Sequence, residues 1–190
     1  MVTFTHYYNV HNEGFKQKLG MLGMLASMAF TTPLISKSAD TLFNQLSRHE
    51  GYSKKMYLDS KGIPTIGIGF NLNDANNRRI LSKLGITDKQ IKTGLSDQQV
   101  KTLFDYSMKQ AKSDALKFLP DLYSHPVNVQ NAIIDMSFNL GLNRLNKFVQ
   151  FKKSLQNKDY KKASADMLDS LWAKQVGKRA TYLANLVRSS

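Results

Sequence analysis

The stretch "SRHEGYSKKMYLDSKGIPTIGIGF", Ser47–Phe70, carries the features that decide the fold. Its Glu50 is one of only two glutamates in the chain and stands directly before Gly51. The preceding "SADTLFNQLSRHEG" has apolar residues at helical spacing, begins with the capping candidates Ser38 and Asp40, and ends on a glycine. The pattern predicts a helix whose last turn contains Glu50.

The segment "MYLDSKGIPTIGIGF" predicts a β-hairpin that turns at residues 60–62. Side chains alternate between the two faces of a strand. In this hairpin the alternation gives one apolar face, which should pack inward, and one face with polar residues and glycines. Glycines on such a face permit close approach of a ligand. The apolar face of the second strand has Ile66, Ile68 and Phe70, and the other face has Asp59, Thr65, Gly67 and Gly69.

Glu50 has the surroundings that a proton-donating carboxylic acid needs. Such an acid requires a raised pKa near neutral pH, and both apolar neighbours and the negative end of a helix dipole raise it. The last helical turn, with leucine and phenylalanine residues before it, supplies both. Asp59 and the two glycines, taken alone, are equally typical of a tight turn.

The rest of the chain reads as helices, without a strong strand signal. Thr87 with Gln90, and Ser96 with Gln99, form capping-box patterns, and the second opens a long helix over about 97–119. Asp74 caps an earlier helix. A strongly apolar helix should end at Gly141, and shorter helices should begin near residues 146, 159 and 178. We expect a mainly helical α+β fold in which a long helix joins a small N-terminal hairpin lobe to a C-terminal helical lobe.

Composition narrows the classes of function. The 190 residues, 42% hydrophobic, are enough for one core. The absence of cysteine excludes disulfides, thiol nucleophiles and cysteine zinc sites. No histidine or acid cluster demands a metal, so we expect neither metal nor cofactor. The net charge of +13 favours an anionic partner, but no nucleic-acid-binding motif is present. We expect a monomer that does not bind nucleic acid.

Residues 1–38 form a tail distinct from the domain at 39–190. Leu19–Ser36 contains eighteen residues without a charge, follows Lys16 and Lys18, and is only weakly hydrophobic. It fits a weak membrane anchor or uncleaved export signal, a signal peptide cleaved after Ala29, or an ordinary buried segment. The positive flank favours export or membrane association.

The order Glu50-Gly51, Asp59, then Thr65 inside "TIGIGF" closely resembles the phage-type lysozymes, the endolysin and tail-lysozyme muramidases of glycoside hydrolase family 24. "AIIDMSFNLG" and "GKRATYLANLVR" extend the resemblance over about 40–188. The resemblance implies that Glu50 is the general acid, that Asp59 and Thr65 position the attacking water, and that Arg179 pairs with Glu50.

The resemblance also implies a substrate cleft. The helix "DMSFNLG" lies along the cleft in related enzymes, which points to Ser137 and Asn139; Trp172 is more typical of a core. The family often has histidine where this chain has Phe70. The expected substrate contacts are Gly67, Gly69, Phe70, Ser137 and Asn139.

The expected activity is hydrolysis of peptidoglycan between N-acetylmuramic acid and N-acetylglucosamine during bacterial lysis. A water held by Asp59 and Thr65 gives inversion, and direct attack by Asp59 gives retention; the resemblance favours inversion. One alternative is a lytic transglycosylase, which needs the glutamate but no water. The other is a non-enzymatic cationic protein that binds walls or membranes. We expect transient inner-membrane association and a place in the host periplasm; the alternatives are the host cytoplasm until a holin opens the membrane, or the virion.

Overall fold

The computed structural model describes Leu46, residues 52–59 and residues 62–190, all within a unit that spans Leu46–Ser190. The predicted helix before Gly51 lies outside these residues except for Leu46, which is helical and fully buried. In chain order the elements are β1 Ser53–Leu58, β2 Pro64–Gly67, β3 Phe70–Asn71, α3 Ala75–Lys83, α4 Asp88–Thr93, α5 Asp97–Phe118, the 3₁₀ helix η1 Leu122–Ser124, α6 Val127–Leu145, α7 Val149–Gln156, α8 Tyr160–Leu168, α9 Leu171–Val176 and α10 Lys178–Arg188.

The described strands form one antiparallel sheet in the order β1-β2-β3. Tyr57 pairs with Thr65 across the first two strands, and Ile66 pairs with Phe70 across the second two. The prediction that one strand runs from Thr65 to Phe70 is wrong, because the chain reverses between β2 and β3. Gly67 and Gly69 have φ values of 66° and 65°, which residues with a side chain rarely adopt, and these glycines make the reversal.

The two strands of the predicted hairpin are buried to different extents. Ile66, Ile68 and Phe70 are at most 2% exposed, as their alternation predicted. Met56 and Leu58 in β1 are 46% and 65% exposed. The register between β1 and β2 shifts between Ser53 and Tyr57, which is an irregularity that strand alternation cannot anticipate.

The helix starts follow the local sequence signals. Asp74 accepts a hydrogen bond from the backbone of Asn77 at the start of α3. Both predicted capping boxes are formed, by Thr87 before α4 and by Ser96 before α5. Helix α5 runs from Asp97 to Phe118, close to the predicted range of about 97–119, and ends two residues before Pro120. The predicted caps are therefore confirmed, and they could be predicted because each depends only on neighbouring residues.

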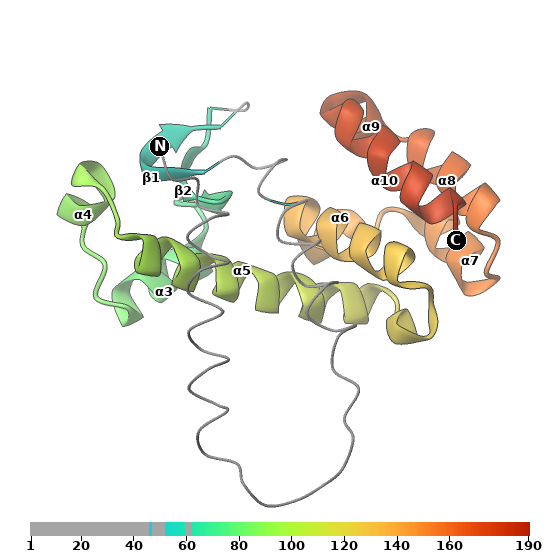
Figure 1. Ribbon diagram of the computed structural model, residues 1–190, viewed down its shortest axis with the longest axis horizontal. Helices are drawn as coiled ribbons and strands as arrows, with labels where there is room; N and C mark the ends of the chain where they lie inside the picture. Colours follow the sequence, from blue (N-terminus) through green and yellow to red (C-terminus); the bar gives the residue numbers. More distant parts are fainter. Residues whose placement is uncertain (1–45, 47–51, 60–61) are drawn as a thin grey trace, which may run out of the picture. The chain divides into compact units, whose positions relative to one another are not determined.

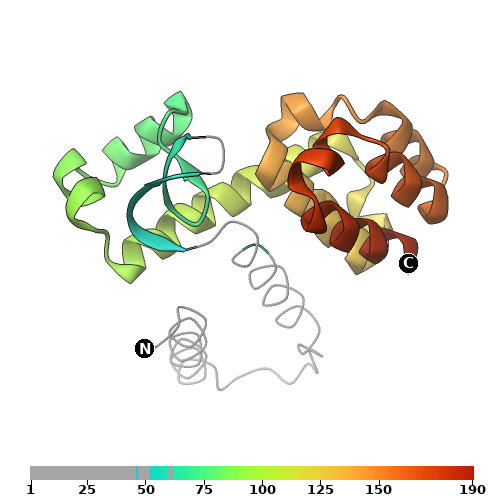
Figure 2. The same ribbon diagram turned by 90° about the horizontal axis from the view of Figure 1, so that it is seen from above.

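Helix α5 connects the sheet to the C-terminal helices (Figures 1 and 2). It contacts β2 and β3 near its beginning and packs extensively against α6 further along. Phe104 of α5 and Phe138 of α6 have ring centroids 6.0 Å apart. The mainly helical α+β fold with a long connecting helix is therefore confirmed.

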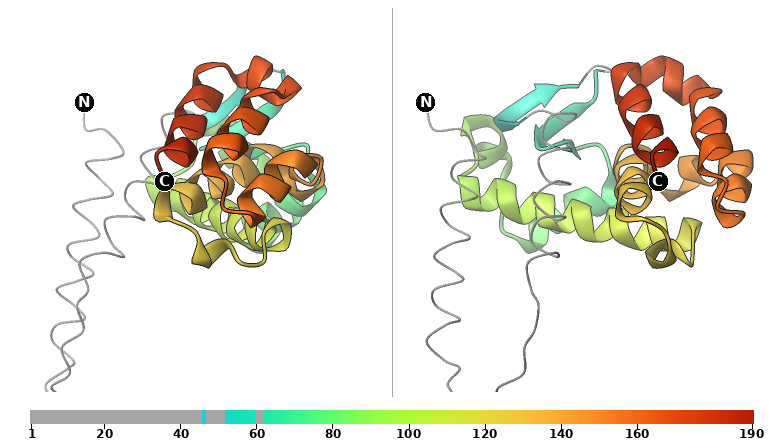
Figure 3. Two further views of the ribbon diagram at one scale, coloured as in Figure 1. Left: turned by 90° about the vertical axis from the view of Figure 1, so that its right-hand side faces the viewer. Right: turned by 45° about the vertical axis from the view of Figure 1, so that its right-hand side comes forward.

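Helices α6 to α10 form the C-terminal group (Figure 3), in which α8 packs on α7 and α10, and α10 packs on α6. Gly141 was expected to end α6, but it kinks the helix at φ 68° and helical structure continues to Leu145. Consequently α7 begins at Val149, after the predicted start near residue 146. Helix α9 was not predicted, although Ser170 caps it by accepting a hydrogen bond from Ala173 N.

Candidate active site

Asp59 and Thr65 converge on the backbone of one residue, Ile63. The Ile63 N–H donates to Asp59 Oδ1 over 2.8 Å, and Thr65 Oγ1 donates to the Ile63 carbonyl oxygen over 2.9 Å. That carbonyl also accepts from Asp59 N at 3.0 Å, while Gly62 N donates to Asp59 O at 2.9 Å. The tight hairpin end thus fixes the carboxylate and the hydroxyl on the backbone N–H and carbonyl of the same residue.

The hydrogen bonds of this pair define what a third group can do there. The single hydroxyl proton of Thr65 is directed to Ile63 O, so its oxygen remains an acceptor for another donor. An ionised Asp59 is also only an acceptor. A water that donates its two protons to Asp59 and Thr65 keeps its lone pairs for nucleophilic attack. Thr65 is 3% exposed and Asp59 is half-buried, so such a water would be recessed.

The two predicted ligand-facing glycines belong to the reversal between β2 and β3. The side of Gly67 where a side chain would stand faces α5, since an added Cβ would lie 3.4 Å from Val100 Cγ1. The positive φ of Gly67 and of Gly69 is needed for the turn itself. Close packing and turn geometry therefore account for both glycines without a ligand.

Arg179 at the start of α10 is buried against α6. Its Nε donates to Asp135 Oδ1 over 2.7 Å, and the exposed fractions of the two side chains are 8% and 0%. Arg179 Nη2 also lies 3.5 Å from the Asp135 carbonyl oxygen. Glu50, the predicted partner of Arg179, lies outside the described residues. The sequence analysis missed Asp135, although a lone acid inside an apolar helix signals a buried partner.

The remaining predicted substrate residues differ in exposure. Phe70 is 1% exposed and Ser137 is 2% exposed, so both side chains belong to the interior. The Ser137 hydroxyl has no hydrogen-bond partner in the part of the chain that the structure describes. Asn139 is half-buried, and its Oδ1 accepts from Trp172 Nε1 over 2.9 Å. Trp172 is 5% exposed and packs edge-on against Phe148, as expected of a core residue.

A cavity of about 590 Å³ lies between the sheet and helices α3 and α4. Met56 and Pro64 line it, and in their strands they adjoin Tyr57 and Thr65, which point to the opposite face. The cavity is therefore on the side of the sheet away from Thr65. Further lining residues are Leu72, Arg78, Leu81, Ile86, Ile91 and Lys92.

Among the residues that the structure describes, no three His, Asp or Glu side chains are grouped so that they could hold a metal ion. None of the helices they form has both the length and the apolar character needed to cross a membrane. The weakly hydrophobic segment Leu19–Ser36 lies outside the described residues.

The phage lysozyme family matches this chain over residues 47–189. The chain is 27% identical over 157 residues to a Dictyostelium discoideum protein named "Probable T4-type lysozyme 1", with 77% of this chain and 92% of that protein covered. It is 26% identical over 157 residues to the pre-baseplate central spike protein Gp5 of Enterobacteria phage T4, with 77% of this chain covered. The match spans only 27% of the length of the spike protein.

Proposed function

The chain belongs to the phage lysozyme family, and from this premise we propose that it hydrolyses peptidoglycan at the β-1,4 bond between N-acetylmuramic acid and N-acetylglucosamine. The family match confirms the resemblance found in the sequence. The observation that carries the proposal for the reaction is the convergence of Asp59 and Thr65 on Ile63. Glycoside hydrolysis needs a carboxylate on the face of the sugar opposite the acid, and this pair supplies a carboxylate with a second acceptor beside it.

In the proposed mechanism, Glu50 donates its proton to the glycosidic oxygen as the bond to the anomeric carbon breaks. A water donates hydrogen bonds to Asp59 and Thr65 and attacks that carbon from the other side. Asp59 takes the proton that the water releases, so the products are a new sugar hemiacetal and a free alcohol. The fixed acceptor role of the Thr65 hydroxyl favours this water-mediated, inverting course over direct attack by Asp59.

Arg179 has a supporting role in this proposal. Its Nε donates to the buried carboxylate of Asp135 over 2.7 Å, and a guanidinium has five N–H donors, enough to bind a second acid as well. We assign Glu50 as that acid on the family resemblance. For substrate contacts we retain the backbone at Gly69 together with Asn139, because both are partly exposed, whereas Gly67, Phe70 and Ser137 are buried.

Four substitutions test the assignment. Glu50→Gln and Asp59→Asn should each lower the rate of wall hydrolysis by about 10²–10⁴-fold, the usual contribution of a general acid or base. Thr65→Val, which removes the hydroxyl from a buried site, should be slow, whereas Thr65→Ser should recover much of the rate. Wall lysis that survives Glu50→Gln would favour the non-enzymatic cationic alternative and reject the enzymatic proposal.

We also propose that Leu19–Ser36 directs export and holds the protein loosely at the inner membrane until its release into the periplasm. Only six of its eighteen residues are Leu, Ile or Phe, and Gly, Ser, Thr and Pro weaken insertion. Replacing Gly20 and Gly23 by leucine should trap the protein in the membrane fraction and delay lysis. A wild-type protein that stays in the cytoplasm until a separate pore forms, or that is cleaved after Ala29, would contradict this proposal.

A further inference from the structure

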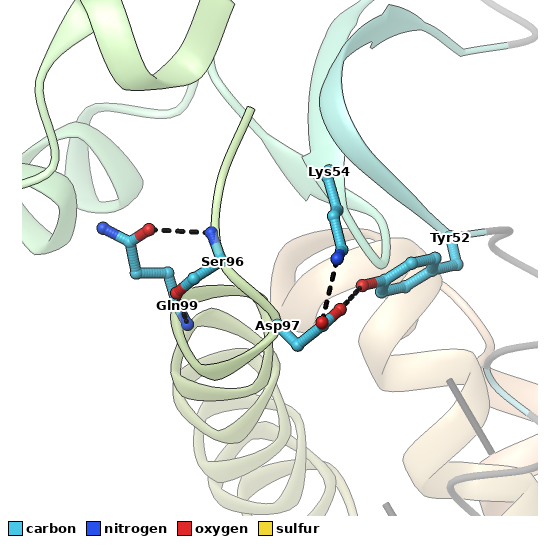
Figure 4. Close-up of polar contacts among 5 residues, drawn as sticks. All are labelled: Tyr52, Lys54, Ser96, Asp97 and Gln99. Carbon is cyan, nitrogen blue, oxygen red and sulfur yellow. Dashed lines mark hydrogen bonds and ion pairs between the residues drawn. The ribbon is translucent and has the colours of Figure 1, made fainter. Parts of the chain in front are cut away.

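A polar cluster ties the beginning of β1 to the beginning of α5 (Figure 4). The Tyr52 hydroxyl donates to Asp97 Oδ1, and Lys54 Nζ lies 2.8 Å from Asp97 Oδ2. Both oxygens of one carboxylate are therefore engaged by two side chains from the other element. Tyr52 and Lys54 are 45 and 43 positions away from Asp97 in the chain, so the cluster is a tertiary contact.

The α5 end of this contact is well fixed. Ser96 and Gln99 close a capping box around the first turn, with Ser96 N donating to Gln99 Oε1 over 2.9 Å. Leu95 N donates to Lys54 O over 2.8 Å, which adds a backbone bond between the same two segments. The first turn of a helix also favours a carboxylate electrostatically, so Asp97 is a suitable anchor there.

The Lys54 ammonium, and after it the Tyr52 hydroxyl, hold the pKa of Asp97 below its ordinary value. Asp97 is therefore ionised at neutral pH, where both of its oxygens accept hydrogen bonds. The cluster is nevertheless partly exposed, with 46% of the Lys54 side chain and 29% of the Asp97 side chain open to solvent. Exposed ion pairs contribute little to stability. If stabilisation were the only role of this cluster, its loss would therefore change the free energy of unfolding only slightly.

We propose that Asp97 is a positioning residue that holds the beginning of β1, and through it Glu50, in register with Asp59 and Thr65. This inference rests on the proposed function. Tyr52 follows Glu50 by two residues, a span of at most about 7 Å of extended chain. Asp59 follows directly on the other end of β1, so the strand connects the two reacting carboxyl groups.

A lost anchor should appear as slower chemistry. Displacement of a reacting group by about 1 Å can cost up to about 10²-fold in rate. The anchor acts on the acid and makes no contact with the sugar in this proposal. The rate constant kcat should therefore fall while KM stays the same, because an interaction needed mainly in the transition state is impaired.

The test compares four variants on a soluble chitooligosaccharide with thermal unfolding measured in parallel. Asp97→Ala and Tyr52→Phe should lower kcat about tenfold with unchanged KM and little change in Tm. Asp97→Asn, which keeps an oxygen for Tyr52, should lie between Asp97→Ala and the wild type. Asp105→Asn is the matched control, because it breaks the 2.6 Å Lys101–Asp105 pair further along α5 and should leave kcat unchanged.

Several results would overturn the inference. Unchanged kcat in both Asp97→Ala and Tyr52→Phe would do so, as would a rise in KM alone or a fall in kcat shared by the Asp105→Asn control. If Asp97→Ala does not fold, Tyr52→Phe decides, since it removes one hydroxyl. Glu50→Gln in the same assay separates the two claims: an active Glu50→Gln rejects the proposed function, whereas an inactive one with normal Tyr52→Phe turnover rejects only the positioning role.

Discussion

Breaking the buried pair of Asp135 and Arg179 should be among the most damaging single changes in the C-terminal helices. Their side chains are 0% and 8% exposed, and the 2.7 Å bond joins α6 to α10. In a buried pair, removing one partner takes a close counter-charge from the other, which typically costs about 3–5 kcal/mol. Asp135→Ala and Arg179→Ala should therefore each lower the free energy of unfolding by about 3 kcal/mol or more.

That loss has a measurable thermal equivalent. A protein of 150–250 residues loses about 2–4 °C of Tm for each kcal/mol, so a loss of about 3–5 kcal/mol should make each alanine variant melt about 6–20 °C below the wild type. Asp135→Asn keeps an oxygen for Arg179 Nε and loses only the charge assistance, for about 1–2 kcal/mol. The exposed Asp105→Asn change should cost about 0.3–0.5 kcal/mol, the value of an i,i+4 pair.

The assay is urea and thermal unfolding followed by circular dichroism, with wall-digestion rates measured below the transition. Arg179→Ala should also lose activity, because the proposed partner of Glu50 is removed. Asp135→Leu combined with Arg179→Met should cost less than the sum of the two alanine losses, because the two side chains are in direct contact and their effects are not additive. Wild-type melting of Asp135→Ala would refute the reasoning, because it would mean that the buried charge of Arg179 does not depend on Asp135.

Three further predictions follow from the charge distribution and the backbone. Digestion of whole walls should fall steeply with added salt, whereas cleavage of an uncharged chitooligosaccharide should not, because the net charge of +13 acts through screened contacts with anionic polymers; equal salt slopes would exclude this role. The lowered pKa of Asp97 means that its stabilisation is present above the ordinary value of 3.8 and is lost as pH falls through the lowered pKa. The small Tm difference between wild type and Asp97→Ala should therefore begin to shrink below the ordinary value of 3.8 and vanish below the lowered pKa, and a difference that grows there would show the opposite linkage. Gly67→Ala should cost about 1–2 kcal/mol from its φ of 66°, about as much as Gly85→Ala at φ 65°, because the 3.4 Å distance from the new Cβ to Val100 is an ordinary van der Waals contact; equal stability of Gly67→Ala and wild type would show that the turn relaxes.

The parts of the fold that the sequence predicted depend on short-range chemistry. The capping boxes at Thr87 and Ser96 use a side chain and a backbone amide three residues apart, so their pattern is complete within four letters. The burial of Ile66, Ile68 and Phe70 follows from alternating hydrophobicity. Local pattern thus identified the helix starts and the inner face of the hairpin.

The parts that sequence reasoning missed are tertiary. The 44-residue separation between Asp135 and Arg179 leaves no local signal beyond a lone acid in an apolar helix. The Asn139–Trp172 bond joins α6 to α9, and neither residue predicts the other. Gly141 was expected to end a helix, but its positive φ only kinks the helix, which resumes and runs to Leu145.

For the candidate site, the sequence identified candidate residues by their type and spacing, but their contacts could be known only from the structure. The alternation of β2 predicted a ligand-facing Gly67, but the side of Gly67 where a side chain would stand faces Val100. Asp59 and Thr65 share the backbone of Ile63 because it lies at the closed end of the hairpin, where Leu58 pairs with Pro64. The direction of the hydrogen bond from Thr65 to the Ile63 carbonyl could come only from the structure.

The proposed function requires hydrolysis by water, and mass spectrometry of the muropeptides released from purified walls separates hydrolysis from transglycosylation. Water as the nucleophile leaves a reducing N-acetylmuramic acid at each new end, and digestion in ¹⁸O-labelled water should add one heavy oxygen there. The account predicts reducing, singly labelled ends throughout the digest. Anhydro-muramic ends without label would mean intramolecular transglycosylation, and would contradict it.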